Sequence, residues 1–134
     1  MAGYSNTPLT KKLGIKEGYN VFISHPPQKY FEWLSPLPAS VTVKSRLSGV
    51  LDFIHVFVKD ERSFRQEFIR AKKHMDKAGM LWISWPKKAA KVPTDLDENK
   101  IRDFGLKNGL VDVKVCAVDE VWSGLKFVFR VADR

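Results

Sequence analysis

The sequence has little of the chemistry from which most metal centres and catalytic sites are built. Its 134 residues include one cysteine and three histidines, which show no metal-ligand spacing. A single thiol also excludes an internal disulfide. No serine stands in a nucleophile elbow, and there is neither a P-loop nor a Gly-x-Gly-x-x-Gly motif. The sequence therefore predicts no metal site and no glycine-rich loop to hold a phosphate.

Long hydrophobic segments are missing as well. The unbroken apolar runs are far shorter than the roughly 20 residues of a membrane-spanning helix. The first residues lack the charged and apolar regions of a signal peptide. Cys116, the single thiol, lies in an apolar strand pattern, which indicates a core residue in a reducing compartment. We expect a cytoplasmic protein with no membrane anchor.

The chain has ample material for one folded core. Hydrophobic residues make up 44% and aromatic residues 12% of the sequence, enough to bury a core without disulfides or metals. We expect a single Rossmann-like domain over residues 1–134, with an N-terminal arm over 1–18. The net charge of +8 favours an anionic ligand or partner, such as a nucleic acid, a phosphorylated molecule or an acidic protein. Much of this charge stands in scattered lysine pairs, which is typical of a solvated surface.

Strand and helix patterns alternate along the chain. Apolar runs predict strands at 19–24, 41–47, 51–58, 80–85, 111–118 and 125–131, and one-sided apolar spacing predicts helices at 28–34, at 61–75 and between 95 and 108. This alternation predicts an α/β fold: a single open, mostly parallel Rossmann-like sheet with helices on both faces and a C-terminal antiparallel hairpin. Residues 122–124 are expected to form the hairpin turn, with the last strand at the edge of the sheet. If the helix at 61–75 starts at Ser63 instead, Ser63 and Gln66 would form a capping box.

Open parallel sheets bind ligands beyond the carboxyl ends of their strands, at a switch point in strand order. The side chains that follow those ends are the candidate ligand-binding rim: Ser24, His25, Lys59, Asp60, Trp85, Lys87, Lys88, Glu120 and Trp122. His25 has the alternative of bonding only its own loop, and the lysines that of a solvated surface. His55 lies inside a strand pattern and is expected to be a core histidine. Asp119 and Glu120 are adjacent and cannot face each other as an acid and base would, so no catalytic residue is assigned.

From residue 51 onward, the order of elements resembles the C-terminal half of class I S-adenosylmethionine-dependent methyltransferases. In those enzymes too, a parallel sheet ends in a helix, a strand and a long antiparallel hairpin. The resemblance implies a truncated methyltransferase-like fold. The N-terminal half departs from it, because Ser24-His25-Pro26-Pro27 replaces the glycine-rich cofactor loop, and each proline removes an N–H donor. There are also too few strands to place the usual ribose-binding acid. We therefore expect no cofactor, with S-adenosylmethionine as the alternative.

Several motifs resemble those of an uncharacterised bacterial family, a domain of unknown function. The stretches that carry this resemblance are AGYS at 2–5 with TPL at 7–9, KKLGIK at 11–16, SWPKK at 84–88, TDL at 94–96 and VDVKVCAVDE at 111–120 with WSGL at 122–125. Together they cover nearly the whole chain. The resemblance implies no particular activity.

Three functional interpretations follow. The leading one is a non-catalytic binding module that holds an anionic ligand or partner at the basic, aromatic rim. The first alternative is a divergent S-adenosylmethionine-dependent methyltransferase-like enzyme. The second is an interaction subunit that pairs with another chain through the exposed edge of its hairpin. The sequence leaves the oligomeric state open.

Overall fold

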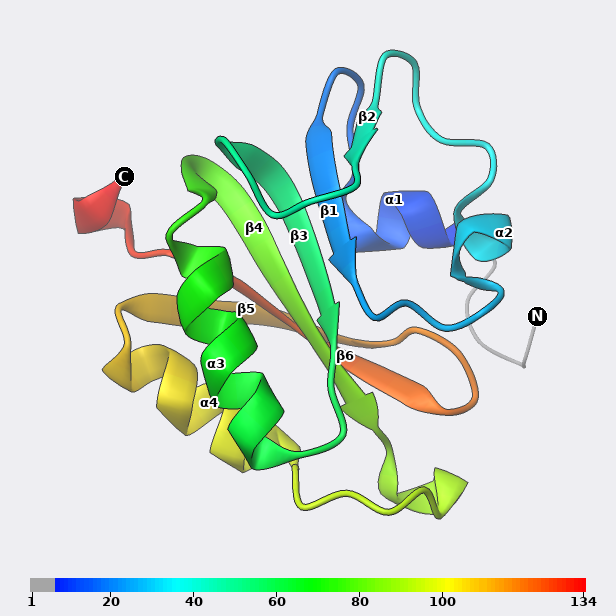
Figure 1. The fold of residues 1–134 in the computed structure, drawn as a ribbon, viewed down its shortest axis with the longest axis vertical. Helices are drawn as coiled ribbons and strands as arrows, with labels where there is room; N and C mark the ends of the chain where they lie inside the picture. The colour runs from blue at the N-terminus through cyan, green and yellow to red at the C-terminus, as the bar shows by residue number, and fades with distance from the viewer. Residues whose placement is uncertain (1–6) are drawn as a thin grey trace.

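Residues 7–134, which the computed structural model describes, form one open sheet with helices on both of its faces (Figure 1). The strands are β1 (Asn20–Ser24), β2 (Thr42–Lys44), β3 (Leu51–Phe57), β4 (Met75–Pro86), β5 (Leu110–Ala117) and β6 (Trp122–Phe129). The helices are α1 (Leu9–Leu13), α2 (Tyr30–Leu34), α3 (Glu61–Lys72) and α4 (Glu98–Lys107), with short 3-10 turns η1 (Lys88–Ala90) and η2 (Val131–Asp133).

The strand order is β2-β1-β3-β4-β6-β5 within the described residues. The pairs β2–β1, β1–β3 and β3–β4 are parallel, and β6 runs antiparallel to both β4 and β5. This confirms the predicted α/β fold with its mostly parallel sheet and C-terminal antiparallel strands. One detail is wrong: β6 lies inside the sheet, and β5 is the edge strand of the hairpin.

The hairpin turn also differs from the prediction, because residues 122–124 begin β6. The Asp119 carboxylate accepts the backbone N–H groups of Val121 and Trp122, at 3.0 and 2.7 Å, and so closes the turn one step earlier. Trp122 is then free to pair with Pro86, at the end of β4. The local hydrogen bonds of an aspartate thus decide where the second strand starts.

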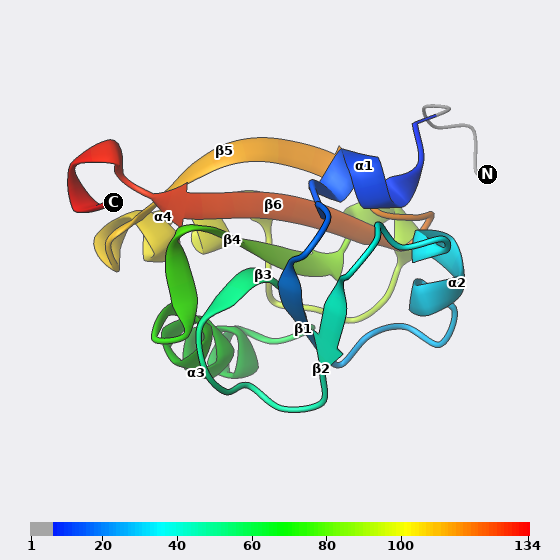
Figure 2. The same ribbon diagram turned by 90° about the horizontal axis from the view of Figure 1, so that it is seen from above.

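Two layers of helix cover the sheet: α3 and α4 pack on one face, and α1 and α2 on the other (Figure 2). Strand β3 is apolar on both sides for this reason. Its Ile54 and Val56 belong to the cluster under α3 and α4, while Phe53 and Phe57 belong to the cluster under α1 and α2. Each face of the sheet therefore has its own buried core.

The two tryptophans of β4 point to opposite faces, as a separation of three residues in a strand requires. Trp82 lies in the cluster under α1 and α2, and its indole N–H donates to the Leu13 carbonyl at 2.8 Å. That bond fixes α1 against the sheet. Trp85 lies in the cluster under α3 and α4, only 6% exposed. Trp85, a candidate for the rim, is therefore part of the core.

Helix α3 begins at a different cap from the predicted one. The Asp60 carboxylate accepts the backbone N–H of Ser63 at 2.8 Å, so Asp60 is the N-cap. The helix starts at Glu61, as predicted, and the alternative start with a Ser63–Gln66 capping box is not adopted. Asp60 has an extended backbone, which lets its short side chain reach back over the first turn. The helix starts immediately after β3, close to the carboxyl end of that strand.

The connection from β2 to β3 is short for two parallel strands, which are usually joined by a dozen residues or more. Residues 45–50 cross over β1 as an irregular chain with several bends and no helix (Figure 1). Leu47 within this link packs against the core on the α3 side. A strand of three residues needs little return path, so the fold completes this crossover with a minimal chain.

The N-terminal arm was expected over residues 1–18, and residues 1–6 lie outside the described part. From Leu9 onward, the arm forms α1, and Leu13 and Ile15 are buried in the sheet's core. None of the helices in the described part is long and apolar enough to cross a membrane.

Candidate functional site

A pocket of about 550 Å³ opens at the carboxyl ends of β1 and β3. The loop His25-Pro26-Pro27, which follows β1, lines it together with Val58, Lys59 and Asp60, which follow β3. Strand order reverses here, because β2 flanks β1 on one side and β3 on the other. This is the switch point at which open α/β sheets bind ligands, and the volume is typical of a small-molecule site.

The loop after β1 turns at His25, whose backbone has a φ of 53°. Glycine adopts this left-handed conformation without strain, so His25 occupies a turn position at which glycine is the usual residue. Pro26 and Pro27 follow and carry no N–H. The loop therefore presents an imidazole and proline rings to the pocket, and few backbone donors.

A carboxylate from the neighbouring helix reaches over the end of β1. Ser24 is buried, and its hydroxyl donates to the Glu67 side chain of α3. Arg70 also donates to this carboxylate, at 3.3 Å. Glu67 is thus held at the pocket wall as an anchored acceptor. It was missed in the sequence, although Asp60, Ser63 and Glu67 recur at spacings of three and four and so share one side of α3.

An aromatic pair forms the opposite wall. Trp122 stands edge-on to Phe57, with ring centroids 5.1 Å apart and an interplanar angle of 89°. Phe57 is buried at the end of β3, and Trp122 is half-buried at the start of β6. The hydrogen bond from the Trp122 backbone to Asp119 fixes where this side chain enters the pocket.

The predicted rim residues divide into two groups. His25, Lys59, Asp60 and Trp122 line the pocket, and Ser24 lies beneath it through its bond to Glu67. Lys87, Lys88 and Glu120 are not among its lining residues. The backbone N–H of Lys87 bonds to Val121 at 2.8 Å, Lys88 begins η1, and Glu120 is exposed in the β5–β6 turn.

The charge of the pocket differs from the basic rim that the sequence suggested. Its lining residues include two carboxylates, Asp60 and Glu67, and one ammonium group, that of Lys59, while Arg70 pairs with Glu67 from outside the lining. Hydrogen bonds from the Ser63 backbone and side chain lower the pKa of Asp60 from its ordinary value, so its carboxylate is ionised at neutral pH. The pocket therefore lacks the excess of positive charge expected of an anion site, and its carboxylate oxygens suit a ligand that carries hydroxyl groups or positive charge.

The described residues offer neither a cluster of metal ligands nor a thiol that is set up to react. Within residues 7–134, no group of three or more His, Cys, Asp or Glu side chains lies close enough together to hold a metal ion. Cys116 is half-buried on β5, and burial raises the pKa of its thiol, which keeps it protonated. His55 is a core histidine, as expected: it is fully buried and bonded to Tyr30 and Ser84.

No family model and no curated protein matches the chain, so the resemblance to the uncharacterised bacterial family stays a prediction. Solved structures do match. The ribosomal protein L11 methylase of Lactobacillus delbrueckii subsp. bulgaricus aligns over 91% of this chain and 75% of its own, with a TM-score of 0.63 and 10% identity. A SAM-dependent methyltransferase of Aquifex aeolicus covers 90% and 87%, with a TM-score of 0.61 and 14% identity.

The fibrillarin of Aeropyrum pernix, solved with bound S-adenosyl-L-methionine, aligns over 94% of this chain and 70% of its own, with a TM-score of 0.58 and 11% identity. These similarities overturn two expectations. A non-catalytic binding module was favoured by the basic, aromatic rim and the lack of catalytic residues, and the absence of a cofactor by the missing glycine loop. The Lactobacillus and Aquifex structures, however, are a methylase and a methyltransferase, and the fibrillarin holds S-adenosyl-L-methionine. At such low identity the comparison shows the fold. The chain has a shortened class I methyltransferase-like fold.

Proposed function

We propose that the chain is a divergent S-adenosylmethionine-dependent methyltransferase-like enzyme, and that the pocket at the ends of β1 and β3 holds the cofactor. The observation that carries this proposal is the position of the pocket at the switch point of a methyltransferase-like sheet. When bound, S-adenosylmethionine supplies a methyl group on a sulfonium for transfer to a nucleophile of the substrate.

The side chains of the pocket suit most parts of this cofactor. A carboxylate accepts ribose hydroxyls in the related dinucleotide folds, and Glu67, anchored by Ser24, offers one here. The aromatic pair Phe57–Trp122 suits the adenine ring or the sulfonium, since cations are attracted to aromatic faces. A carboxylate and an aromatic face are also both compatible with a ligand whose reacting centre, the sulfonium, is positively charged.

The amino-acid end of the cofactor must be held in another way than by a glycine loop. The end of β2, whose last residue is Lys44, supplies no acid that could bind the ribose in place of Glu67. Lys59 and His25 line the pocket and are the groups that would donate hydrogen bonds to the amino-acid carboxylate. The proposal therefore assigns to side chains the contacts that backbone N–H groups make in a glycine-rich loop.

Calorimetric titration with S-adenosylmethionine and S-adenosylhomocysteine tests the proposal. We expect saturable binding by the native chain, and affinity weaker by about tenfold in Glu67→Gln, which loses one charge-assisted acceptor but keeps the side-chain shape. Glu32→Gln, a matched change on the exposed side of α2, should bind as the native chain does.

Two results would contradict the proposal. One is the absence of binding by either ligand at millimolar concentration, with the native fold verified by circular dichroism. The other is equal affinity in Glu67→Gln and Glu32→Gln, which would remove the pocket carboxylate from the binding site.

A further inference from the structure

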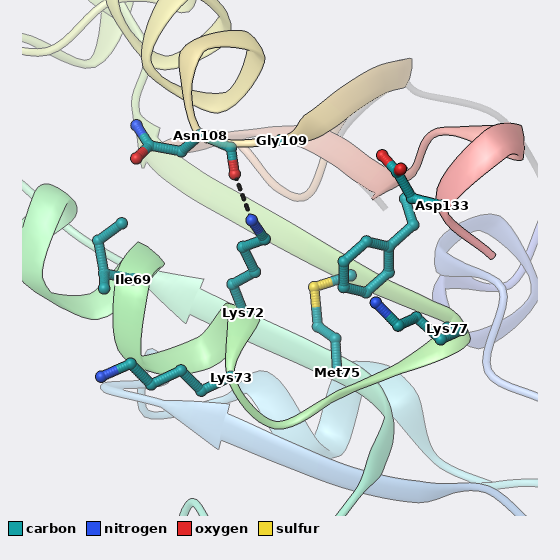
Figure 3. A pocket seen from close by; sticks show the side chains of 9 residues that line it. Ile69, Lys72, Lys73, Met75, Lys77, Asn108, Gly109 and Asp133 are labelled. Carbon is teal, nitrogen blue, oxygen red and sulfur yellow. Dashed lines mark hydrogen bonds between the residues drawn. The ribbon is translucent and has the colours of Figure 1, made fainter.

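We infer that a second pocket, at the opposite edge of the sheet, binds the phosphate group of a small phosphorylated molecule. This pocket measures about 720 Å³. It lies between the end of α3, the start of β4, the turn from α4 to β5 and the C-terminal η2 (Figure 3). Its walls carry three lysines, Lys72, Lys73 and Lys77, and its apolar lining residues are Ile69, Met75 and Phe129.

The ammonium group of Lys72 is held in place at the pocket wall. It donates to the Asn108 carbonyl at 2.7 Å, which leaves two further N–H groups for a ligand. Gly109 makes this arrangement feasible: its φ is +88°, and a Cβ there would lie 2.7 Å from the Lys72 Nζ. A side chain at residue 109 would therefore push the ammonium out of position.

Lys77 is fixed by a different contact. Its Nζ lies 4.3 Å from the centroid of the Phe129 ring, a cation–π distance. Figure 3 shows Lys72 and Lys77 on either side of Met75. Two ammonium groups from separate elements thus reach one pocket, each restrained by a contact that leaves donors unused.

A simpler explanation accounts for only part of this cluster. Lysines at the end of a helix complement the negative end of its dipole, and Lys72 and Lys73 stand at the end of α3. Lys77 belongs to β4 and has no such role. Among the described lining residues, Asp133 is the single carboxylate against three ammonium groups, so the pocket keeps an excess of positive charge.

The excess of positive charge and the apolar lining residues together indicate the class of ligand. Lysine ammonium groups bind phosphate as compact point charges. The apolar side chains of Ile69, Met75 and Phe129 would then cover an apolar part attached to that phosphate. The pocket shares no lining residue with the proposed cofactor pocket, whose carboxylates favour the opposite charge. The two proposals can therefore be tested independently of each other.

Amide NMR titrations at constant ionic strength, with inorganic phosphate and with phenyl phosphate as probes, test the inference. We expect saturable shifts at Lys72, Lys77 and Gly109, and tighter binding of phenyl phosphate than of inorganic phosphate. Lys77→Gln should weaken phenyl phosphate by about tenfold. Lys11→Gln, which removes an equal charge from the exposed side of α1, should leave the affinity unchanged.

Equal losses in Lys77→Gln and Lys11→Gln would overturn the inference, since they would indicate attraction by net charge alone. Shifts scattered over the surface, or phosphate effects reproduced by chloride, would overturn it too. Lys72→Met serves as a second variant, with its fold checked by the same spectra because Lys72 also holds Asn108. Binding of S-adenosylhomocysteine should be equal in the native chain and in Lys77→Gln, which separates this result from the cofactor proposal.

Discussion

A buried hydrogen-bonded chain of three side chains joins α2, β3 and β4. Tyr30 Oη lies 2.8 Å from His55 Nδ1, and His55 Nε2 lies 2.7 Å from Ser84 Oγ. Either neutral tautomer satisfies both ring nitrogens, because each hydroxyl donates or accepts as required. The Ser84–His55 pair has the spacing of a nucleophile and its base, but both side chains are 0% exposed, so no substrate reaches them. Their role is to hold the three elements together.

Removing one end of this chain leaves a buried ring nitrogen without a partner. We expect Ser84→Ala to lower the free energy of unfolding by about 1–3 kcal/mol, the cost of an unsatisfied buried polar atom. Urea denaturation of the native chain and the variant measures this change. Ser45→Ala, at an exposed serine, should be neutral; equal stability of the two variants would contradict the assigned role.

The protonation of His55 gives a second prediction. Burial lowers its pKa from 6.5 to about 3, so the folded protein keeps the ring neutral where an unfolded chain takes up a proton. The contribution to stability is complete above pH 6.5 and is lost as pH falls toward 3, at about 1.4 kcal/mol per pH unit. Ring NMR signals of His55 should stay those of a neutral imidazole at pH 5. A His55 midpoint near 6.5 would contradict the burial argument.

For single residues, the sequence predicted which side chains are buried better than it predicted their hydrogen-bond partners. His55 stands in an apolar strand run, which is enough to place it in the core. Its partners lie 25 and 29 residues away in sequence, and no local pattern links them to it. Glu67 was missed for the same reason: the hydroxyl that orients it belongs to Ser24, 43 residues earlier.

Among the elements, α4 makes its closest approach to the sheet at Gly105. A Cβ built there would lie 2.1 Å from Cε1 of Phe127, a buried side chain of β6. Phe127 is itself held edge-on against Phe68 of α3, with centroids 5.4 Å apart. The ring therefore has little room to move away, and the glycine sets the distance between helix and strand.

Gly105→Ala should accordingly destabilise the protein. The gain in helix propensity is about 1 kcal/mol, whereas overpacking of a core costs about 1–3 kcal/mol, and a 2.1 Å contact lies at the severe end. We expect a net loss on the order of 1–2 kcal/mol in urea denaturation. Asp103→Ala, on the exposed side of the same helix, should change stability by about 0.5 kcal/mol or less. A stabilised Gly105→Ala variant would show that α4 can move off the sheet.

The strands and helices were largely predictable, because apolar runs and one-sided spacing are local signals. Two details that failed depend on local hydrogen bonds of a carboxylate: Asp60 caps α3, and Asp119 closes the hairpin before residue 122. The position of β6 inside the sheet was also missed, because strand order depends on pairing between segments far apart in sequence.

For the whole molecule, the pockets at the two opposite ends of the strands differ in their charged side chains. The carboxyl edge has a pocket with Asp60 and Glu67, and the other edge has a pocket with three lysines. A net charge of +8 does not say where on the molecule the positive charge gathers. The sequence placed the candidate rim at the carboxyl ends of the strands, and a pocket lies at two of those ends. It assigned the wrong charge there because the Glu67 carboxylate comes from a helix, while Lys87 and Lys88 lie outside the pocket.

The central claim, that the pocket between the ends of β1 and β3 holds S-adenosylmethionine, is tested most directly by mapping where the cofactor product binds. Amide NMR spectra recorded during titration with S-adenosylhomocysteine give both affinity and position. The account predicts saturable shifts that are largest at His25, Lys59 and Glu67, all of which line that pocket. Absence of saturable shifts at millimolar ligand, or shifts confined to the lysine pocket at the opposite edge, would contradict it.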